Sequence, residues 1–149
     1  ESFTLGRNED LVRVDEIKII DKPKEVRDKF INNHNAYIPV KYTDEYVNGI
    51  VLFSEYGRPD IIGSNTIIGA HSGYGSNAYF NYLSHLNLGD MIYLKYDGYE
   101  YKYEVKRVYE VFDTDLYVLD SDEFTKLTLL TCKIGENNKR IVVESYLLN

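Results

Sequence analysis

Residues 91–106 read Met-Ile-Tyr-Leu-Lys-Tyr-Asp-Gly-Tyr-Glu-Tyr-Lys-Tyr-Glu-Val-Lys, and this stretch sets the class of the fold. From Tyr99 onward, tyrosines and a valine at odd positions alternate with charged residues at even positions, which is the period of a half-buried strand. Asp97-Gly98 favours a tight type I′ turn. The stretch therefore predicts two antiparallel strands, 91–96 and 99–106, joined as a hairpin.

Further strands are expected on both sides of this hairpin. Runs of apolar and β-branched residues bounded by turn residues place them at 37–40, 47–53, 66–70, 126–132 and 140–147. Apolar residues three or four positions apart predict two short helices, over 23–33 and 77–86. The expected fold class is mainly β, a closed and mostly antiparallel barrel of seven to eight strands, because closure leaves few free edges.

Length and charge limit the organisation and the function. The 149 residues are expected to form a single domain, with 1–35 as a helical or extended segment packed on the barrel. The net charge is −7, with acidic and basic residues interleaved, which disfavours binding to nucleic acid or to an anionic membrane surface. No apolar run approaches the roughly 18–20 residues of a membrane span. Because the chain starts at Glu1 without a signal peptide, we interpret it as an excised fragment.

Cys132 is the only cysteine, and it ends the run Thr128-Leu129-Leu130-Thr131-Cys132. A lone thiol forms no internal disulfide, and a metal site needs more ligands than one cysteine supplies. Two interpretations remain. The thiol is an inert core residue, which is the commoner case for a cysteine in an apolar strand, or it is a nucleophile with a proton-transfer partner and a group that holds an oxyanion.

His71 and Arg140 are the candidate partners, since His71 follows the expected strand 66–70 and Arg140 opens the strand 140–147. If strands 126–132 and 140–147 pair, Cys132 and Arg140 emerge at one rim of the sheet. A thiolate there would attack a carbonyl, an imidazole would protonate the leaving amine, and a guanidinium would hold the oxyanion. A structural or exposed histidine and a solvated arginine are the ordinary alternatives, and spacing alone does not decide between them.

A resemblance favours the catalytic interpretation. Residues 128–132 followed by Arg140-Ile141-Val142-Val143 resemble the sortase signature, a Thr-Leu-any-Thr-Cys strand, a short loop, then Arg and an aliphatic run. Asn65-Thr66-Ile67-Ile68-Gly69-Ala70-His71 resembles the sortase strand that ends in the catalytic histidine, and Leu88-Gly89-Asp90-Met91-Ile92 resembles the start of the next strand. The resemblance runs from about Asn65 to Leu147.

The resemblance implies a sortase-like barrel and a cysteine transpeptidase, with hydrolysis as a side reaction. Such enzymes cleave a C-terminal sorting signal of the Leu-Pro-any-Thr-Gly kind on secreted proteins and pass the acyl group to an amine. By position, Cys132 would be the nucleophile, His71 the general acid and then base, and Arg140 the oxyanion stabiliser or substrate clamp, with Thr131 a weaker candidate for substrate contact. The amine would belong to a cell-wall precursor peptide or to a pilin lysine. The family implies the outer face of a Gram-positive plasma membrane, with the anchor outside this chain.

Some features depart from the family pattern. Many relatives have Gly-His followed by Arg or Asn, whereas this chain has Ala70-His71-Ser72. The 61 positions from His71 to Cys132 (132 − 71) leave no room for the long helical insertion of class B sortases. There is no Asp-Pro-aromatic lid motif of the class C kind. The subclass therefore stays open, and so does the sorting motif.

No cofactor is expected. Some sortases bind calcium near an acidic loop, and here five acidic residues precede the cysteine strand, Asp113, Asp115, Asp120, Asp122 and Glu123, for which a solvated loop is the favoured interpretation. His34 and His85 are expected at the surface. The alternative functions are a pilin-polymerising sortase, another cysteine hydrolase, and a catalytically silent β-barrel binding module.

Overall fold

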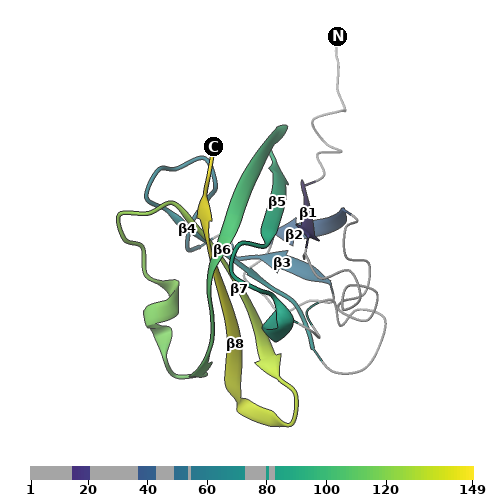
Figure 1. Ribbon diagram of the computed structural model, residues 1–149, viewed down its shortest axis with the longest axis vertical. Coiled ribbons are helices and arrows are strands. Elements are labelled where there is room, and N and C mark those ends of the chain that lie inside the picture. Colours follow the sequence, from purple (N-terminus) through teal and green to yellow (C-terminus); the bar gives the residue numbers. More distant parts are fainter. Residues whose placement is uncertain (1–14, 21–36, 43–48, 54, 73–79, 81–82) are drawn as a thin grey trace.

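The computed structural model describes residues 15–20, 37–42, 49–53, 55–72, 80 and 83–149. In this part of the chain eight strands close into a barrel in the order β1-β2-β3-β4-β7-β8-β6-β5 (Figure 1). The strands are β1 (Asp15–Ile20), β2 (Ile38–Tyr42), β3 (Ile50–Leu52), β4 (Asn65–Gly69), β5 (Met91–Tyr96), β6 (Tyr99–Phe112), β7 (Lys126–Lys133) and β8 (Glu136–Leu147). Two short 3-10 helices, η2 (Leu83–His85) and η3 (Leu116–Leu119), complete the described elements. The predicted fold class, a closed and mainly β barrel, is confirmed.

Two of the eight strand pairings are parallel, β2 with β3 and β4 with β7, and the others are antiparallel. Strand β7 is central, because it pairs with β4 on one side and with β8 on the other. Parallel strands end at the same edge of a sheet. The residues that follow β4 and those at the end of β7 therefore meet at one edge of the barrel.

The β5–β6 hairpin has the predicted turn. Asp97 and Gly98 both have positive φ, 51° and 83°, as a type I′ turn requires. Strand β6 continues to Phe112, beyond the predicted end, and its pairing with β8 shifts register between Val105 and Arg107. Strand β8 begins at Glu136 rather than at 140, because the turn from β7 is confined to two residues, with Gly135 at a φ of 86°.

The N-terminal part of the barrel differs from the sequence expectation. Strand β1 was not predicted, yet it pairs with both β2 and β5. The helix expected over 23–33 lies outside the described residues. Of the helix expected over 77–86, the described part contains the single 3-10 turn η2. The 1–149 domain assignment stays a prediction.

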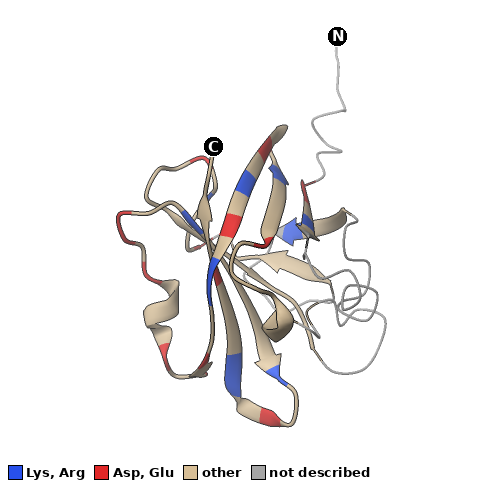
Figure 2. Cartoon of the chain, in the orientation of Figure 1, with Lys and Arg blue, Asp and Glu red and all other residues tan. Residues whose placement is uncertain are grey.

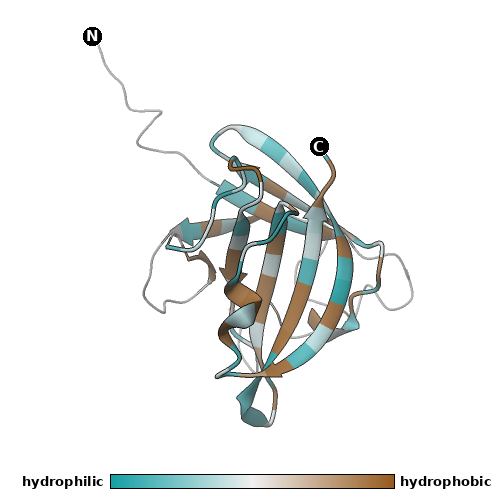
Figure 3. Ribbon diagram, turned by 90° about the vertical axis from the view of Figure 1, so that its left-hand side faces the viewer, coloured by the Kyte–Doolittle hydropathy of each residue, from teal (hydrophilic) through white to brown (hydrophobic). Residues whose placement is uncertain are grey.

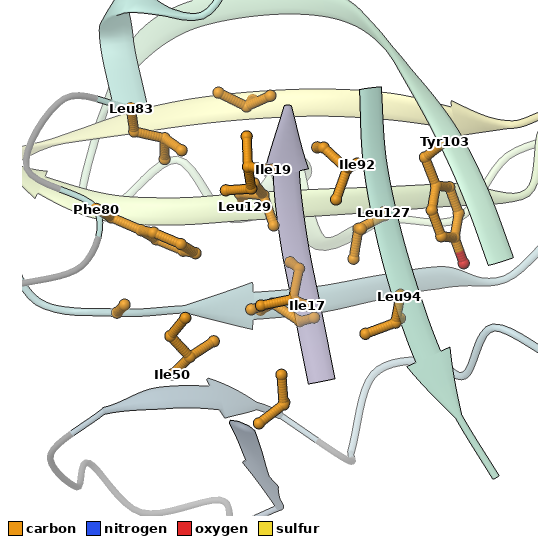
Figure 4. Packing of buried hydrophobic residues seen from close by; sticks show 14 of the residues in the cluster. Ile17, Ile19, Ile50, Phe80, Leu83, Ile92, Leu94, Tyr103, Leu127 and Leu129 are labelled. Carbon is orange, nitrogen blue, oxygen red and sulfur yellow. The ribbon is translucent and has the colours of Figure 1, made fainter. Parts of the chain in front are cut away.

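Alternate residues of the strands fill the interior of the barrel. Figure 4 shows isoleucines and leucines from β1, β5 and β7 directed toward one another, with Phe80 and Leu83 at one end. The alternation is visible as bands along the strands in Figure 3. A second, smaller cluster of Val111, Val118 and Val142 lies outside this core and packs against Leu119 and Leu130. This second cluster holds the connection between β6 and β7 onto the sheet.

Candidate active site

Cys132 and Arg140 are partners across the β7/β8 pair. Residues directly opposite each other in an antiparallel pair project to the same face, with Cβ atoms about 4.5–5.5 Å apart. The expectation that these two strands pair and bring the thiol and the guanidinium to one rim is thus confirmed. Cys132 forms no disulfide and is half-buried, whereas the aliphatic residues of the core are fully buried.

His71 is held beside the same rim by hydrogen bonds on either side of it. The ladder between β4 and β7 is continued by Ala70 N, which donates to Leu130 O at 3.3 Å. Thr131 Oγ1 donates to Ala70 O at 2.8 Å, and Ser72 Oγ donates to Cys132 O at 2.5 Å. The backbone flanking His71 is therefore tied to the backbone at Cys132, and the His71 side chain is half-buried.

Arg140 is oriented by its own hairpin. Its Nη1 donates to Asn137 O at 2.8 Å and to Lys139 O at 3.1 Å. Because both bonds leave from Nη1, the Nε and Nη2 hydrogens are not used by these two contacts. The neighbouring Lys133 ammonium donates to Glu136 at 2.8 Å and to Glu110 at 3.1 Å, and these hydrogen bonds raise the pKa of Lys133.

A pocket of about 180 Å³ opens beside the thiol. Thr131, Cys132 and Arg140 supply its polar end. Most of its other lining side chains are apolar and come from the sheet and from the β6–β7 connection, Val51, Phe53, Ala70, Val111, Phe112, Leu116, Val118, Leu119 and Leu130. In Figure 3 the connection that carries η3 lies in front of the sheet, so the pocket has a sheet floor and a loop wall.

Thr131 has a structural partner in addition to its place in the pocket. Its side chain is buried, with 5% exposed, and its hydroxyl hydrogen is directed to Ala70 O. A contact with substrate would therefore use the methyl group or an oxygen lone pair. The substrate-binding role of Thr131 stays a prediction.

The acidic residues of the β6–β7 connection have separate surroundings (Figure 2). Asp113 and Asp115 line the pocket, and Asp115 Oδ2 accepts a hydrogen bond from Phe112 N at 2.8 Å. Asp122 pairs with Lys126 Nζ at 3.0 Å. Within the described residues no group of three or more His, Cys, Asp or Glu side chains is placed to hold a metal ion. His85 is exposed, as expected, and His34 lies outside the described residues.

A family model, the sortase domain, matches residues 30–148. The chain belongs to the sortase family. The resemblance seen in the sequence is confirmed. No match is found among curated protein sequences.

Solved sortase structures share the fold of this sortase. Sortase C-1 from Actinomyces oris is 21% identical, with a TM-score of 0.77, over 94% of this chain and 77% of that chain. Sortase A from Corynebacterium diphtheriae is 22% identical, with a TM-score of 0.75, over 91% of this chain and 60% of that one. Sortase C1 from Streptococcus agalactiae is 23% identical, with a TM-score of 0.73, over 90% of this chain and 66% of that one. This sortase thus spans less than two thirds of the last two chains.

Sequence reasoning missed several residues at the site. Position 72 stood out only as a departure from the family pattern, which gave no sign of its hydrogen bond to Cys132 O. The wall residues Leu116 and Leu119 lie in a stretch that had been assessed only for its acidic side chains. Asn65 was noted as the start of the histidine strand, and its side-chain contacts were not foreseen. None of the helices in the described part of this sortase has the length and apolarity to cross a membrane.

Proposed function

We propose that this sortase is a cysteine transpeptidase that cleaves an LPXTG-like C-terminal sorting signal on secreted proteins. The observation that carries the proposal is the opposition of Cys132 and Arg140 at the end of an apolar pocket, with the backbone around His71 hydrogen-bonded to the same strand end. In this proposal Cys132 is the nucleophile, His71 the general acid and then base, and Arg140 the oxyanion stabiliser or substrate clamp.

The proposed reaction has two acyl transfers. The Cys132 thiolate attacks the carbonyl carbon of the Thr–Gly bond, and the oxyanion that develops is held by Arg140 N–H groups not used by Asn137 and Lys139. The imidazolium of His71 gives its proton to the departing amine as the C–N bond breaks, which leaves a thioester. The incoming amine attacks the thioester, His71 accepts the proton that this amine loses, and the thiolate departs.

The pocket suits the proposed substrate. Its apolar lining, with Val51, Phe53 and Leu116 among its residues, can bury aliphatic and proline side chains of an extended signal. In this proposal the scissile carbonyl binds at the polar end, beside the thiol. Thr131 is proposed as a further contact at that end. Asp113 and Asp115 add negative charge to the wall.

The amine acceptor is proposed to be a cell-wall precursor peptide. A pilin lysine is the second candidate, and it is supported by the similarity to a pilus-related sortase C of Group B Streptococcus, which is 22% identical with a TM-score of 0.75 over 92% of this chain and 68% of that one. Following the family, we place the enzyme on the outer face of a Gram-positive plasma membrane, held there by a segment outside this sequence. Residues 1–149 are proposed to form one catalytic domain.

A peptide-library assay tests the proposal. The wild-type protein is incubated with sorting-signal peptides, with and without triglycine or a lysine-containing pilin peptide, and products are identified by mass spectrometry. We expect cleavage after Thr and incorporation of one amine. Cys132→Ala is expected to abolish cleavage, and cleavage that persists in this variant would exclude the thiol mechanism. If a thiol-reactive signal mimic leaves the mass of the native protein unchanged, the protein is a silent binding module instead.

A further inference from the structure

The pocket beside Cys132 has two walls of different construction. The floor consists of residues in or beside β3, β4, β6, β7 and β8, which are tied together by the ladders of the barrel. The opposite wall is η3, whose residues Leu116, Val118 and Leu119 line the pocket from the connection between β6 and β7. This wall has no ladder of its own. A backbone hydrogen bond from Asp113 N to Asn138 O at 2.8 Å ties the start of the connection to β8, and side-chain contacts hold η3 itself against the sheet.

Asn65 supplies the polar part of these contacts. Its side chain is fully buried, and its Nδ2 donates to Val118 O at 3.1 Å and to Asp120 O at 3.0 Å. These two carbonyls lie at the C-terminal end of η3, where a helix leaves backbone acceptors without intrahelical partners. A side chain from β4 thus caps the helix that forms the pocket wall.

The orientation of the Asn65 amide is fixed by its neighbours. Both carbonyls require a donor, so the nitrogen must face η3. The oxygen then faces Thr128, whose Oγ1 donates to Asn65 Oδ1 at 2.7 Å. Thr128 is also fully buried. A buried polar group that loses its hydrogen-bond partner destabilises the folded state, so the loss of one of these three hydrogen bonds is expected to weaken the other two.

This buried network lies on the two strands that end at the candidate catalytic groups. Asn65 opens β4, which leads to His71, and Thr128 lies on β7, which leads to Cys132. The same rigid pair of parallel strands therefore fixes both the reactive groups and the position of η3. A displacement of η3 would change the width of the pocket while the ladder between β7 and β8 keeps the thiol opposite Arg140.

We infer that Asn65, oriented by Thr128, is a positioning residue that sets the substrate pocket of this enzyme by clamping η3 over Cys132. The inference rests on the proposed function, since the pocket is taken to bind the sorting signal. Asn65 touches neither the thiol nor the substrate, and its effect is on substrate binding. The clamp belongs to the folded protein without substrate, so it is measurable without catalysis.

The test replaces the two donors while keeping the shape of the side chain. Asn65→Asp removes the amide that serves both Val118 O and Asp120 O, and a carboxyl group at this buried place offers them at most one hydrogen, when it is protonated. Leaving at least one of these buried carbonyls without a donor is expected to speed hydrogen exchange of the backbone amides in residues 116–120 by roughly 10- to 30-fold. With a sorting-signal peptide, KM is expected to rise by about tenfold while kcat stays within about threefold.

Ser145→Ala is the matched control. It removes a fully buried hydroxyl that donates to Leu127 O at 2.8 Å in the β7/β8 pair, outside the η3 wall. Its exchange in 116–120 and its KM are expected to equal those of the wild type. If Asn65→Asp fails to fold, Thr128→Val removes the orienting donor without changing the shape, and about threefold faster exchange in 116–120 is expected.

The outcomes separate the clamp from the proposed function. The clamp is overturned if residues 116–120 exchange at the same rate in Asn65→Asp as in Ser145→Ala. If Asn65→Asp does not fold, the same comparison is made with Thr128→Val. A fall in kcat at constant KM also overturns the clamp. If the wild type cleaves no sorting-signal peptide, the proposed function fails. The exchange measurement then decides the clamp by itself.

Discussion

The hydrogen bond from Ser72 Oγ to Cys132 O joins the residue after the candidate general acid to the backbone of the candidate nucleophile. Ser72→Ala removes this hydrogen bond, and the side chain loses a single oxygen atom. Thr131 continues to hold Ala70 O, so the strands stay paired up to that point. The variant therefore loosens the last residue of the site on each strand.

The expected magnitude follows from the geometry. The hydrogen bond has a length of 2.5 Å, and both residues are half-buried. We expect it to contribute about 0.5–1.5 kcal/mol to the free energy of unfolding. For a chain of this length each kcal/mol lost lowers Tm by about 2–4 °C, so we expect a fall of about 1–6 °C. Because a tenfold change in rate corresponds to about 1.4 kcal/mol, we expect kcat to fall by about 3- to 10-fold with KM almost unchanged.

Two assays measure the effect. Steady-state transpeptidation with a sorting-signal peptide and triglycine gives kcat and KM. The rate of alkylation by iodoacetamide reports on Cys132 alone, because the chain has one cysteine. Ser72→Thr keeps the hydroxyl and is expected to restore both rates. Ser84→Ala, at an exposed serine of η2, is the control for a general effect of serine removal.

The reasoning is refuted if Ser72→Ala lowers Tm but leaves kcat and the alkylation rate at wild-type values. The hydrogen bond would then only stabilise the fold. It is also refuted if Ser72→Thr behaves like Ser72→Ala, since the hydroxyl would not be the cause.

Three other variants probe separate parts of the structure. Arg140→Ala is expected to lower kcat by about 10²- to 10³-fold, as for the loss of an oxyanion donor, and a fall of less than threefold in the peptide assay would remove Arg140 from the mechanism. Gly98→Ala places a side chain at a φ of 83° and is expected to lower Tm by about 2–4 °C with kcat unchanged, which thermal melts and the peptide assay check together. The hydrogen bond from Phe124 N and the nearby Lys126 hold the pKa of Asp122 below its ordinary value, so its carboxylate stabilises the fold at neutral pH and loses the effect as pH falls through the lowered pKa. Thermal melts should give a higher Tm for the wild type than for Asp122→Asn at neutral pH, with a difference that shrinks as pH falls through the lowered pKa; a constant difference would contradict this.

The sequence could predict elements whose pattern is local and uninterrupted. The hairpin around Asp97-Gly98 was predicted with its turn type, since alternation and turn chemistry agree. The end of β6 was placed too early because the register shift between Val105 and Arg107 breaks the period of two. Strand β1 was missed because it has few inward residues, Ile17 and Ile19 among them, in a highly charged stretch.

Of the candidate site, the placement of Cys132 opposite Arg140 was predictable from the sequence. The pairing that sets Cys132 opposite Arg140 followed from two adjacent strands and a short loop. The contacts of Asn65 and Ser72 could not be predicted, because each joins residues more than 50 positions apart and leaves no local pattern. The roles assigned to the trio come from the family resemblance and stay predictions.

The parallel pairing of β4 with β7 has a consequence for when the thiol acquires its surroundings. Asn65 pairs with Lys126, 61 positions away (126 − 65), so this pairing must close a long loop before it gains any contact. Until it forms, Cys132 lacks the hydrogen bonds by which Ser72 and Thr131 join its strand end to the backbone flanking His71. Because Cys132 is the only cysteine of the chain, its rate of alkylation during refolding should report the formation of the β4–β7 pairing.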